Sequence, residues 1–149
     1  MRTLLFVCSA NTCRSAMAEA LGRAMITEAK LGNRLQARSA GTAALDGLPL
    51  ADLAQAALAK SFGKAPAHRS RQLTPALLAG DVLVVALTRE HKDAALQLGA
   101  GPERLFTLGE LAGEPSTDVE DPYGETEVRD SLGEIARLLR KAWPRLSGA

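Results

Sequence analysis

The chain has 149 residues, of which 46% are hydrophobic and 23% charged, and its formal net charge is +1. This length predicts one domain, spanning residues 1–149, with enough chain to bury a sizeable core. A charge so close to zero argues against broad electrostatic attraction to nucleic acid or to a membrane surface. No apolar run approaches the roughly 20 residues of a membrane span, and the N-terminal apolar stretch is too short for a signal peptide.

Alanine (27 residues) and leucine (24 residues) dominate the composition, whereas only five residues are aromatic. This balance predicts a core of small aliphatic side chains and favours helices. The two cysteines, Cys8 and Cys13, are too few for a disulfide framework, so we expect a reducing, cytoplasmic setting. Both cysteines lie in one six-residue stretch, which makes that stretch the first candidate for chemistry.

In the first half of the chain, residues 3–7 form a continuous apolar run, which predicts a strand buried on both faces. A polar loop over residues 8–14 follows. Helical spacing begins at Ser15, and Gly32 and Asn33 are expected to end that helix. A second strand is expected over residues 35–39, and a second helix over residues 50–62.

In the second half, residues 81–87 are a solid apolar block typical of a central strand. Thr88 is expected to cap the helix that follows, which runs to about residue 98. A short fourth strand is predicted over residues 105–107, and a long amphipathic helix from Glu125 to Leu146. Apolar strands that alternate with helices predict an α/β fold, a four-stranded parallel sheet with helices on both faces.

The loop after the first strand has the composition of a phosphate-binding site. Its sequence is a cysteine, five residues and an arginine, placed between a buried strand and a helix start. Backbone N–H groups of such a loop and the helix dipole attract anions, and Arg14 can grip two phosphoryl oxygens. The positive electrostatic potential of these N–H groups and of the helix dipole also favours a thiolate at Cys8, the form that attacks phosphorus. The predicted phosphate-binding residues are Ser9, Ala10, Asn11, Thr12, Cys13, Arg14 and Ser15.

Two other interpretations of the same residues are weaker. Cys8 could be a small buried hydrophobe and Arg14 a surface charge, because free cysteine is often buried. A zinc site would need paired ligand spacing, which the two cysteines with His68 and His91 do not have. We therefore expect no metal and no cofactor.

With these residues in view, the sequence resembles the low-molecular-weight protein tyrosine phosphatases over nearly its whole length. Residues 7–19 resemble the phosphate loop and first helix of that family, and residues 121–124 (Asp-Pro-Tyr-Gly) resemble its general-acid loop. Residues 39–42 and 68–73 resemble two further family segments. The resemblance implies a phosphate loop after the first strand and a metal-free phosphatase.

The resemblance also implies a two-step reaction. Cys8 would attack phosphorus while Arg14 and the loop amides hold the oxygens, and Asp121 would protonate the leaving atom and then activate water. A supporting hydrogen-bond network would hold the loop, and Ser15 would assist the leaving thiolate. By this carry-over, the network consists of Asn11, Ser39 and His68.

Two positions depart from the family pattern. Ala10 stands where the family usually has glycine, which matters if that position needs a positive φ. Ala16 replaces a first-turn proline, a mild change in a helix that Ser15 can still cap. Outside these motifs, His91 is interpreted as a solvated helix residue and Trp143 as a packing residue.

Substrate preference depends on two positions around the loop. Thr12, where tyrosine-specific members typically carry an apolar branched residue, resembles the protein-arginine phosphatase branch, as does Thr88. Tyr123 is the one aromatic residue of the acid loop, where many tyrosine-specific enzymes show two. These features favour phosphoarginine over phosphotyrosine by a small margin, and Asp121 would then also pair with the guanidinium group.

The expected partners are a phosphorylated protein substrate and, in the loop, inorganic phosphate or sulfate. A protein-tyrosine phosphatase proper is the main alternative. An arsenate reductase shares this loop but generally needs further cysteines late in the chain, and none follows Cys13. A non-catalytic phosphoresidue-binding or redox-sensing module, in which Cys13 traps an oxidised Cys8, is the alternative from another functional class.

Overall fold

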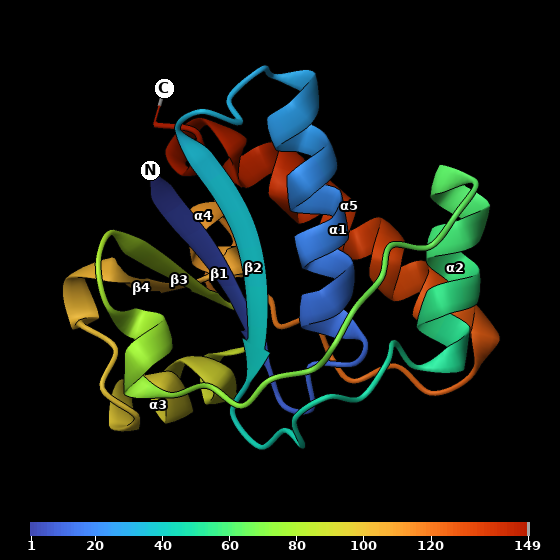
Figure 1. Cartoon of the computed structure of the whole chain (residues 1–149), viewed down its shortest axis with the longest axis horizontal. Coiled ribbons are helices and arrows are strands. Elements are labelled where there is room, and N and C mark those ends of the chain that lie inside the picture. Colours follow the sequence, from blue (N-terminus) through green and yellow to red (C-terminus); the bar gives the residue numbers. More distant parts are fainter. Residues whose placement is uncertain (149) are drawn as a thin grey trace.

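The computed structural model describes residues 1–148 and has four parallel strands in the order β2-β1-β3-β4. Figure 1 shows the twisted sheet with its helices packed around it. The predicted α/β architecture, a four-stranded parallel sheet with helices on both faces, is confirmed. The strands are β1 (Arg2–Cys8), β2 (Leu35–Gly41), β3 (Val82–Ala86) and β4 (Leu105–Thr107).

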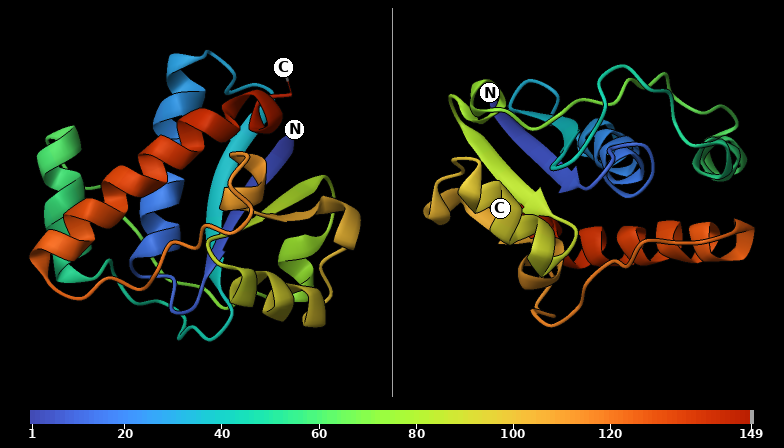
Figure 2. Two further views of the ribbon diagram at one scale, coloured as in Figure 1. Left: turned by 180° about the vertical axis from the view of Figure 1, so that it is seen from behind. Right: turned by 90° about the horizontal axis from the view of Figure 1, so that it is seen from below.

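The two faces of the sheet bury different helices, which the right-hand view of Figure 2, seen from below, separates. Leu4 and Phe6 of β1 pack on one side with the apolar faces of α1 and α5, the principal helices of that layer. Leu5 and Val7 point to the opposite side and pack with Ala95 of α3. The helices are α1 (Arg14–Glu28), α2 (Asp52–Phe62), α3 (Arg89–Gln97), α4 (Leu108–Leu111) and α5 (Glu125–Leu146), with short 3-10 turns at Pro75–Leu78 and Pro102–Arg104.

The helix α1 ends earlier than the sequence suggested. We expected Gly32 and Asn33 to stop it, but its last residue is Glu28. Lys30 takes the left-handed conformation at φ 58°, and the N–H of Leu31 donates to the carbonyl of Ile26. This arrangement is a common C-terminal cap, although lysine is an unusual residue for it. The turn is thus made before the glycine is reached.

The remaining boundaries agree with the expected elements to within one or two residues, apart from the addition of α4. The second helix begins at Asp52 rather than Leu50. Thr88 caps α3 as expected, because its Oγ1 accepts the backbone N–H of His91 at 3.0 Å. No helix in residues 1–148 is long and apolar enough to cross a membrane.

Candidate active site

The loop over residues 8–14 lies at the carboxyl end of β1, one of the two central strands (Figure 1). The chain passes from β1 to β2 on one side, whereas β3 lies on the other side, so the strand order reverses at this point. Ligands of open α/β sheets bind in the crevice outside such a reversal. The fold therefore places the predicted phosphate loop where a ligand is expected.

Cys8 ends β1 with a side chain that is only 2% exposed, and its Sγ lies 2.9 Å from the Oγ of Ser15. This contact brings Ser15 to the predicted nucleophile. It also corrects one expectation, because Ser15 does not cap α1. The N-cap position is Cys13, which makes no side-chain capping bond, and the Ser15 hydroxyl is directed to Cys8 instead.

Asn11 is the residue of the loop whose backbone has a positive φ. Its φ is 60°, in the left-handed region that asparagine tolerates better than most residues. Ala10 is not among the residues with positive φ, so its side chain does not strain the loop. The concern raised by alanine at position 10 therefore does not arise, because the positive φ lies at Asn11.

The side chain of Asn11, fully buried, links three segments. Its Nδ2 donates to the Oγ of Ser15 at 2.8 Å, and its Oδ1 accepts the N–H of Arg71 at 3.0 Å. The backbone carbonyl of Asn11 also lies 2.6 Å from the Nε2 of His68. Two of the three residues expected to support the loop, Asn11 and His68, thus meet.

Ser39 does not join this network. Its Oγ donates to the Oε1 of Glu19 at 2.8 Å, and Glu19 in turn pairs with Arg23 at 2.9 Å. These contacts fasten β2 to α1 rather than to the loop. The expectation that Ser39 contacts the loop is therefore wrong, because the buried carboxylate of Glu19 is the stronger acceptor within its reach.

The end of β2 packs directly on the loop. Backbone N–H groups of Thr42 and Ala43 donate to the carbonyls of Cys8 and Ser9 at 2.8 and 3.0 Å. A side chain on Gly41 would overlap the carbonyl oxygen of Ser9, so a glycine is required for this close approach. These contacts use the outward-facing carbonyls of the loop.

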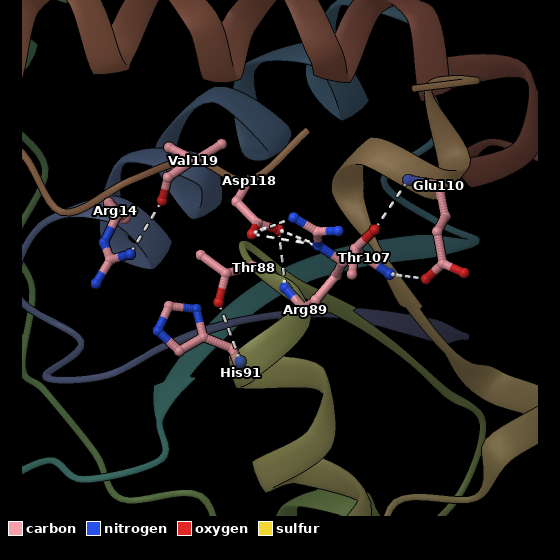
Figure 3. Close-up of polar contacts among 8 residues, drawn as sticks. All are labelled: Arg14, Thr88, Arg89, His91, Thr107, Glu110, Asp118 and Val119. Atoms are coloured by element: carbon pink, nitrogen blue, oxygen red, sulfur yellow. Dashed lines mark hydrogen bonds and ion pairs between the residues drawn. The ribbon is translucent and has the colours of Figure 1, made fainter. Parts of the chain in front are cut away.

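Arg14 is the first residue of α1 and is 7% exposed. Its Nη1 donates to the carbonyl of Val119 at 3.0 Å, as Figure 3 shows. Its Nε lies 3.8 Å from the Oδ1 of Asp121, whose side chain is 59% exposed. The tertiary structure thus brings the predicted acid, 107 positions later in the chain, to the arginine of the loop.

The segment before Asp121 is held at both sides. The N–H of Val119 donates to the carbonyl of Leu87 at 2.9 Å, just beyond the end of β3. Asp118 accepts the backbone N–H of Arg89 at 2.9 Å and pairs with its guanidinium at 3.2 Å (Figure 3). The first turn of α3 therefore fixes the acid loop next to the phosphate loop.

Tyr123 is 78% exposed and lines a pocket of about 360 Å³ beside Asp121. The pocket wall is strongly acidic, with Glu127, Asp130 and Glu134 of α5 among its carboxylates and no lysine or arginine in its lining. An aromatic ring and carboxylates together suit a cationic ligand.

Thr12 is half-buried, and its backbone carbonyl accepts the N–H of Ala51 at 3.0 Å, which ties the loop to the start of α2. Cys13 is also half-buried and is a free thiol, like Cys8. Burial, with the neighbouring Cys8 adding to it, raises the pKa of Cys13 to about 11. Cys13 therefore stays a protonated thiol at neutral pH, which is not the form that acts as a nucleophile.

His91 was interpreted as a solvated residue, and this interpretation is wrong. Its side chain is 5% exposed, and its Nε2 lies 2.9 Å from the Oγ of Ser9 in the phosphate loop. Burial and the charge of Arg14 lower the pKa of His91 to about 4, so the ring is neutral. The signal in the sequence was its place three residues after the cap Thr88. This spacing puts His91 in the first turn of α3, close to the carboxyl end of β3.

Trp143 packs partly buried against the core, as expected. Within residues 1–148, no group of three or more histidine, cysteine or acidic side chains could hold a metal ion.

Comparisons with known proteins agree with this geometry. The family described as low molecular weight phosphotyrosine protein phosphatase matches residues 3–147. The chain is 38% identical over 145 residues to a protein-arginine-phosphatase of Bacillus subtilis, with 93% of this chain and 94% of the relative covered. It is 36% identical over 145 residues to low molecular weight protein-tyrosine phosphatase A of Mycobacterium tuberculosis, with 95% and 86% covered.

Solved structures give the same result. A structure of the YwlE arginine phosphatase, a mutant with a phosphorylated active-site serine, matches with a TM-score of 0.88 at 34% identity and covers 97% of this chain and 95% of that one. A low molecular weight protein tyrosine phosphatase from T. tengcongensis matches with a TM-score of 0.86 at 34% identity, with 97% and 99% covered. The chain is therefore a phosphatase that belongs to the low molecular weight phosphotyrosine protein phosphatase family.

Proposed function

We propose that this protein hydrolyses phosphorylated arginine side chains of proteins through a phosphocysteine intermediate, with residues 1–149 forming a single phosphatase domain. The observation that carries the proposal is the position of Arg14 between the loop and Asp121, with its Nε 3.8 Å from the carboxylate. A phosphoryl group held by Arg14 would lie between the thiol of Cys8 and the acid.

In the first step, the Cys8 thiolate attacks phosphorus, and a sulfur–phosphorus bond forms as the bond to the leaving nitrogen breaks. Asp121 donates its proton to that nitrogen, and the arginine side chain leaves as a guanidinium cation. The loop N–H groups and Arg14 stabilise the charge on the phosphoryl oxygens.

In the second step, water attacks the phosphorus of the phosphocysteine and gives its proton to the Asp121 carboxylate. The sulfur–phosphorus bond breaks, and inorganic phosphate leaves. Ser15, whose Oγ lies 2.9 Å from the Cys8 Sγ, donates a hydrogen bond to the departing thiolate. The charge is supplied throughout by protein groups, so the proposed reaction uses no cofactor.

Two features favour phosphoarginine over phosphotyrosine. Thr12 places a hydroxyl group rather than a larger apolar side chain at the loop, which suits a polar guanidinium group better than a phenyl ring. The carboxylates near Asp121 and the single exposed ring of Tyr123 also suit a cation. Phosphotyrosine is the second candidate, because relatives at similar identity carry the names of both activities.

The decisive experiment compares kcat/KM on phosphoarginine and phosphotyrosine peptides of the same sequence. We expect the higher value for phosphoarginine, whereas a preference above tenfold for phosphotyrosine would exclude this assignment. Cys8→Ser should abolish turnover of both peptides, and retained activity would contradict the nucleophile. Absence of turnover in the wild type would favour a phosphoresidue-binding or redox-sensing module, and reduction of arsenate with an external thiol would favour a reductase.

A further inference from the structure

His91 and Ser9 form a part-buried contact that the proposed reaction does not use. The Oγ of Ser9 lies 2.9 Å from the Nε2 of His91, and no other hydrogen bond of this hydroxyl is present in residues 1–148. Ser9 follows the nucleophile Cys8 directly and belongs to the phosphate loop. The contact therefore links the loop to the first turn of α3.

The backbone of His91 is anchored at the start of α3. Its backbone N–H is bonded to the Oγ1 of Thr88 at the start of α3, as Figure 3 shows. The Nδ1 atom is buried and has no hydrogen-bond partner in the described part of the chain. Within residues 1–148, the Ser9 hydroxyl is thus the only polar group bonded to the ring.

The unpartnered Nδ1 decides which nitrogen carries the proton. A neutral imidazole has one N–H donor and one acceptor. A proton on Nδ1 would leave a buried N–H group without an acceptor, which is rarer and more costly than an unused lone pair. The proton therefore belongs on Nε2, where it is donated to the Oγ of Ser9.

This assignment determines what the Ser9 hydroxyl can do. If its oxygen accepts from His91, its own proton is free for another acceptor. We propose that His91 is a positioning residue, which donates its Nε2–H to Ser9 and so leaves the Ser9 hydroxyl to donate to the anion bound in the phosphate loop. The proposal rests on the function proposed above only in taking that anion to be the transferred phosphoryl group.

The charges around the ring agree with this role. Arg14 faces His91 on the side of the phosphate loop, and Asp118 and Asp121 lie on the side of the acid loop. The nearby guanidinium and burial both oppose a second positive charge on the ring. His91 therefore acts as a neutral donor.

The test uses inorganic phosphate as the probe and measures its dissociation constant by calorimetry or by competitive inhibition. Ser9→Ala and His91→Leu should each weaken phosphate binding by about tenfold, the effect of losing one charge-assisted hydrogen bond. The double variant should lose no more than Ser9→Ala alone, because His91 acts on the anion only through the Ser9 hydroxyl. His91→Gln, whose Nε2 amide can replace the imidazole donor, should stay within about threefold of the wild type.

Ser131→Ala is the control, because Ser131 is a buried serine of α5, outside the phosphate loop, and has no hydrogen-bond partner in residues 1–148. Its phosphate affinity should equal that of the wild type. Additive losses in the double variant, or unchanged affinity in a folded Ser9→Ala protein, would overturn the proposal. So would a failure of His91→Gln to restore binding in a folded protein.

A second measurement decides the matter if His91→Leu does not fold. Long-range ¹H–¹⁵N spectra of the wild type identify the protonated ring nitrogen, which we expect to be Nε2, whereas Nδ1 would overturn the proposal. Phosphate binding and the tautomer are both measured without turnover. A protein that binds phosphate as described but hydrolyses no phosphopeptide would therefore contradict the proposed function and leave the role of His91 supported.

Discussion

The guanidinium of Arg14 donates to the backbone carbonyl of Val119 at 3.0 Å, two positions before Asp121. This bond joins the phosphate loop to the acid loop through the arginine itself. Because Arg14 is buried, its fork has little freedom to turn away from this orientation. The same side chain thus belongs to the anion site and helps to set the position of the acid.

Replacing Asp121 by asparagine should lower kcat on phosphopeptides by about 100-fold or more, because the leaving atom loses its proton donor. The loss should be much smaller on p-nitrophenyl phosphate, since nitrophenolate leaves without protonation. Steady-state kinetics on both substrates checks the prediction. Glu120→Gln, at the exposed neighbouring carboxylate, is the control and should change kcat little. Equal losses on both substrates would contradict the role of Asp121 as the acid.

Thr12→Ile should shift preference toward phosphotyrosine, because an apolar branched side chain can pack against a phenyl ring but offers nothing to a guanidinium group. We expect the ratio of kcat/KM for phosphoarginine to that for phosphotyrosine to fall by about tenfold, a typical effect of one apolar contact. Paired peptides that differ only in the phosphorylated residue provide the measurement. An unchanged ratio would show that the side chain at position 12 does not determine the substrate preference.

Asn11 allows its backbone and side-chain contributions to be separated. Asn11→Gly keeps the left-handed backbone but removes the bonds to Ser15 and Arg71, which should cost about 2 kcal/mol of unfolding free energy. Asn11→Ala should cost about 1 kcal/mol more, because a Cβ is disfavoured at φ 60°. Urea denaturation of the two variants measures both values. Equal stabilities would show that the loop relaxes away from this conformation.

His91 should make the protein less stable in acid. Its pKa is lowered from 6.5 to about 4 in the folded state, mainly by burial, so between these values the unfolded chain binds a proton that the folded chain does not. Stability from this group is therefore present above pH 6.5 and is lost as pH falls toward 4. Between pH 7 and 4.5 the wild type should lose about 2 kcal/mol more than His91→Gln. Denaturant titrations at the two pH values test this difference.

The two cysteines should react differently with iodoacetate. Because burial and the neighbouring Cys8 raise the pKa of Cys13 to about 11, only about one Cys13 in 10⁴ is a thiolate at pH 7. Alkylation should therefore fall on Cys8, the proposed nucleophile, and inorganic phosphate should protect it. Peptide mass spectrometry locates the modification, and Cys8→Ser is the control that should remain unmodified. Alkylation first at Cys13 would contradict this assignment.

Most of the fold could be predicted because its signals are local. The apolar runs at residues 3–7 and 81–87 became the central strands β1 and β3, and the helix cap at Thr88 is set by a bond to His91 only three residues away. The end of α1 could not be predicted in the same way. Lys30 takes a left-handed conformation there, against the usual preference for glycine.

The sequence by itself determined the position of the phosphate loop, because its cysteine and arginine, Cys8 and Arg14, are separated by five residues between a strand and a helix. Only the tertiary structure decided which groups surround that loop. His91 contacts Ser9 across 82 positions, and Val119 contacts Arg14 across 105. Ser39 instead donates a hydrogen bond to Glu19, because a buried polar side chain pairs with the acceptor that packing places nearest to it. Such pairings depend on how the parallel sheet brings together the loops at the carboxyl ends of its strands.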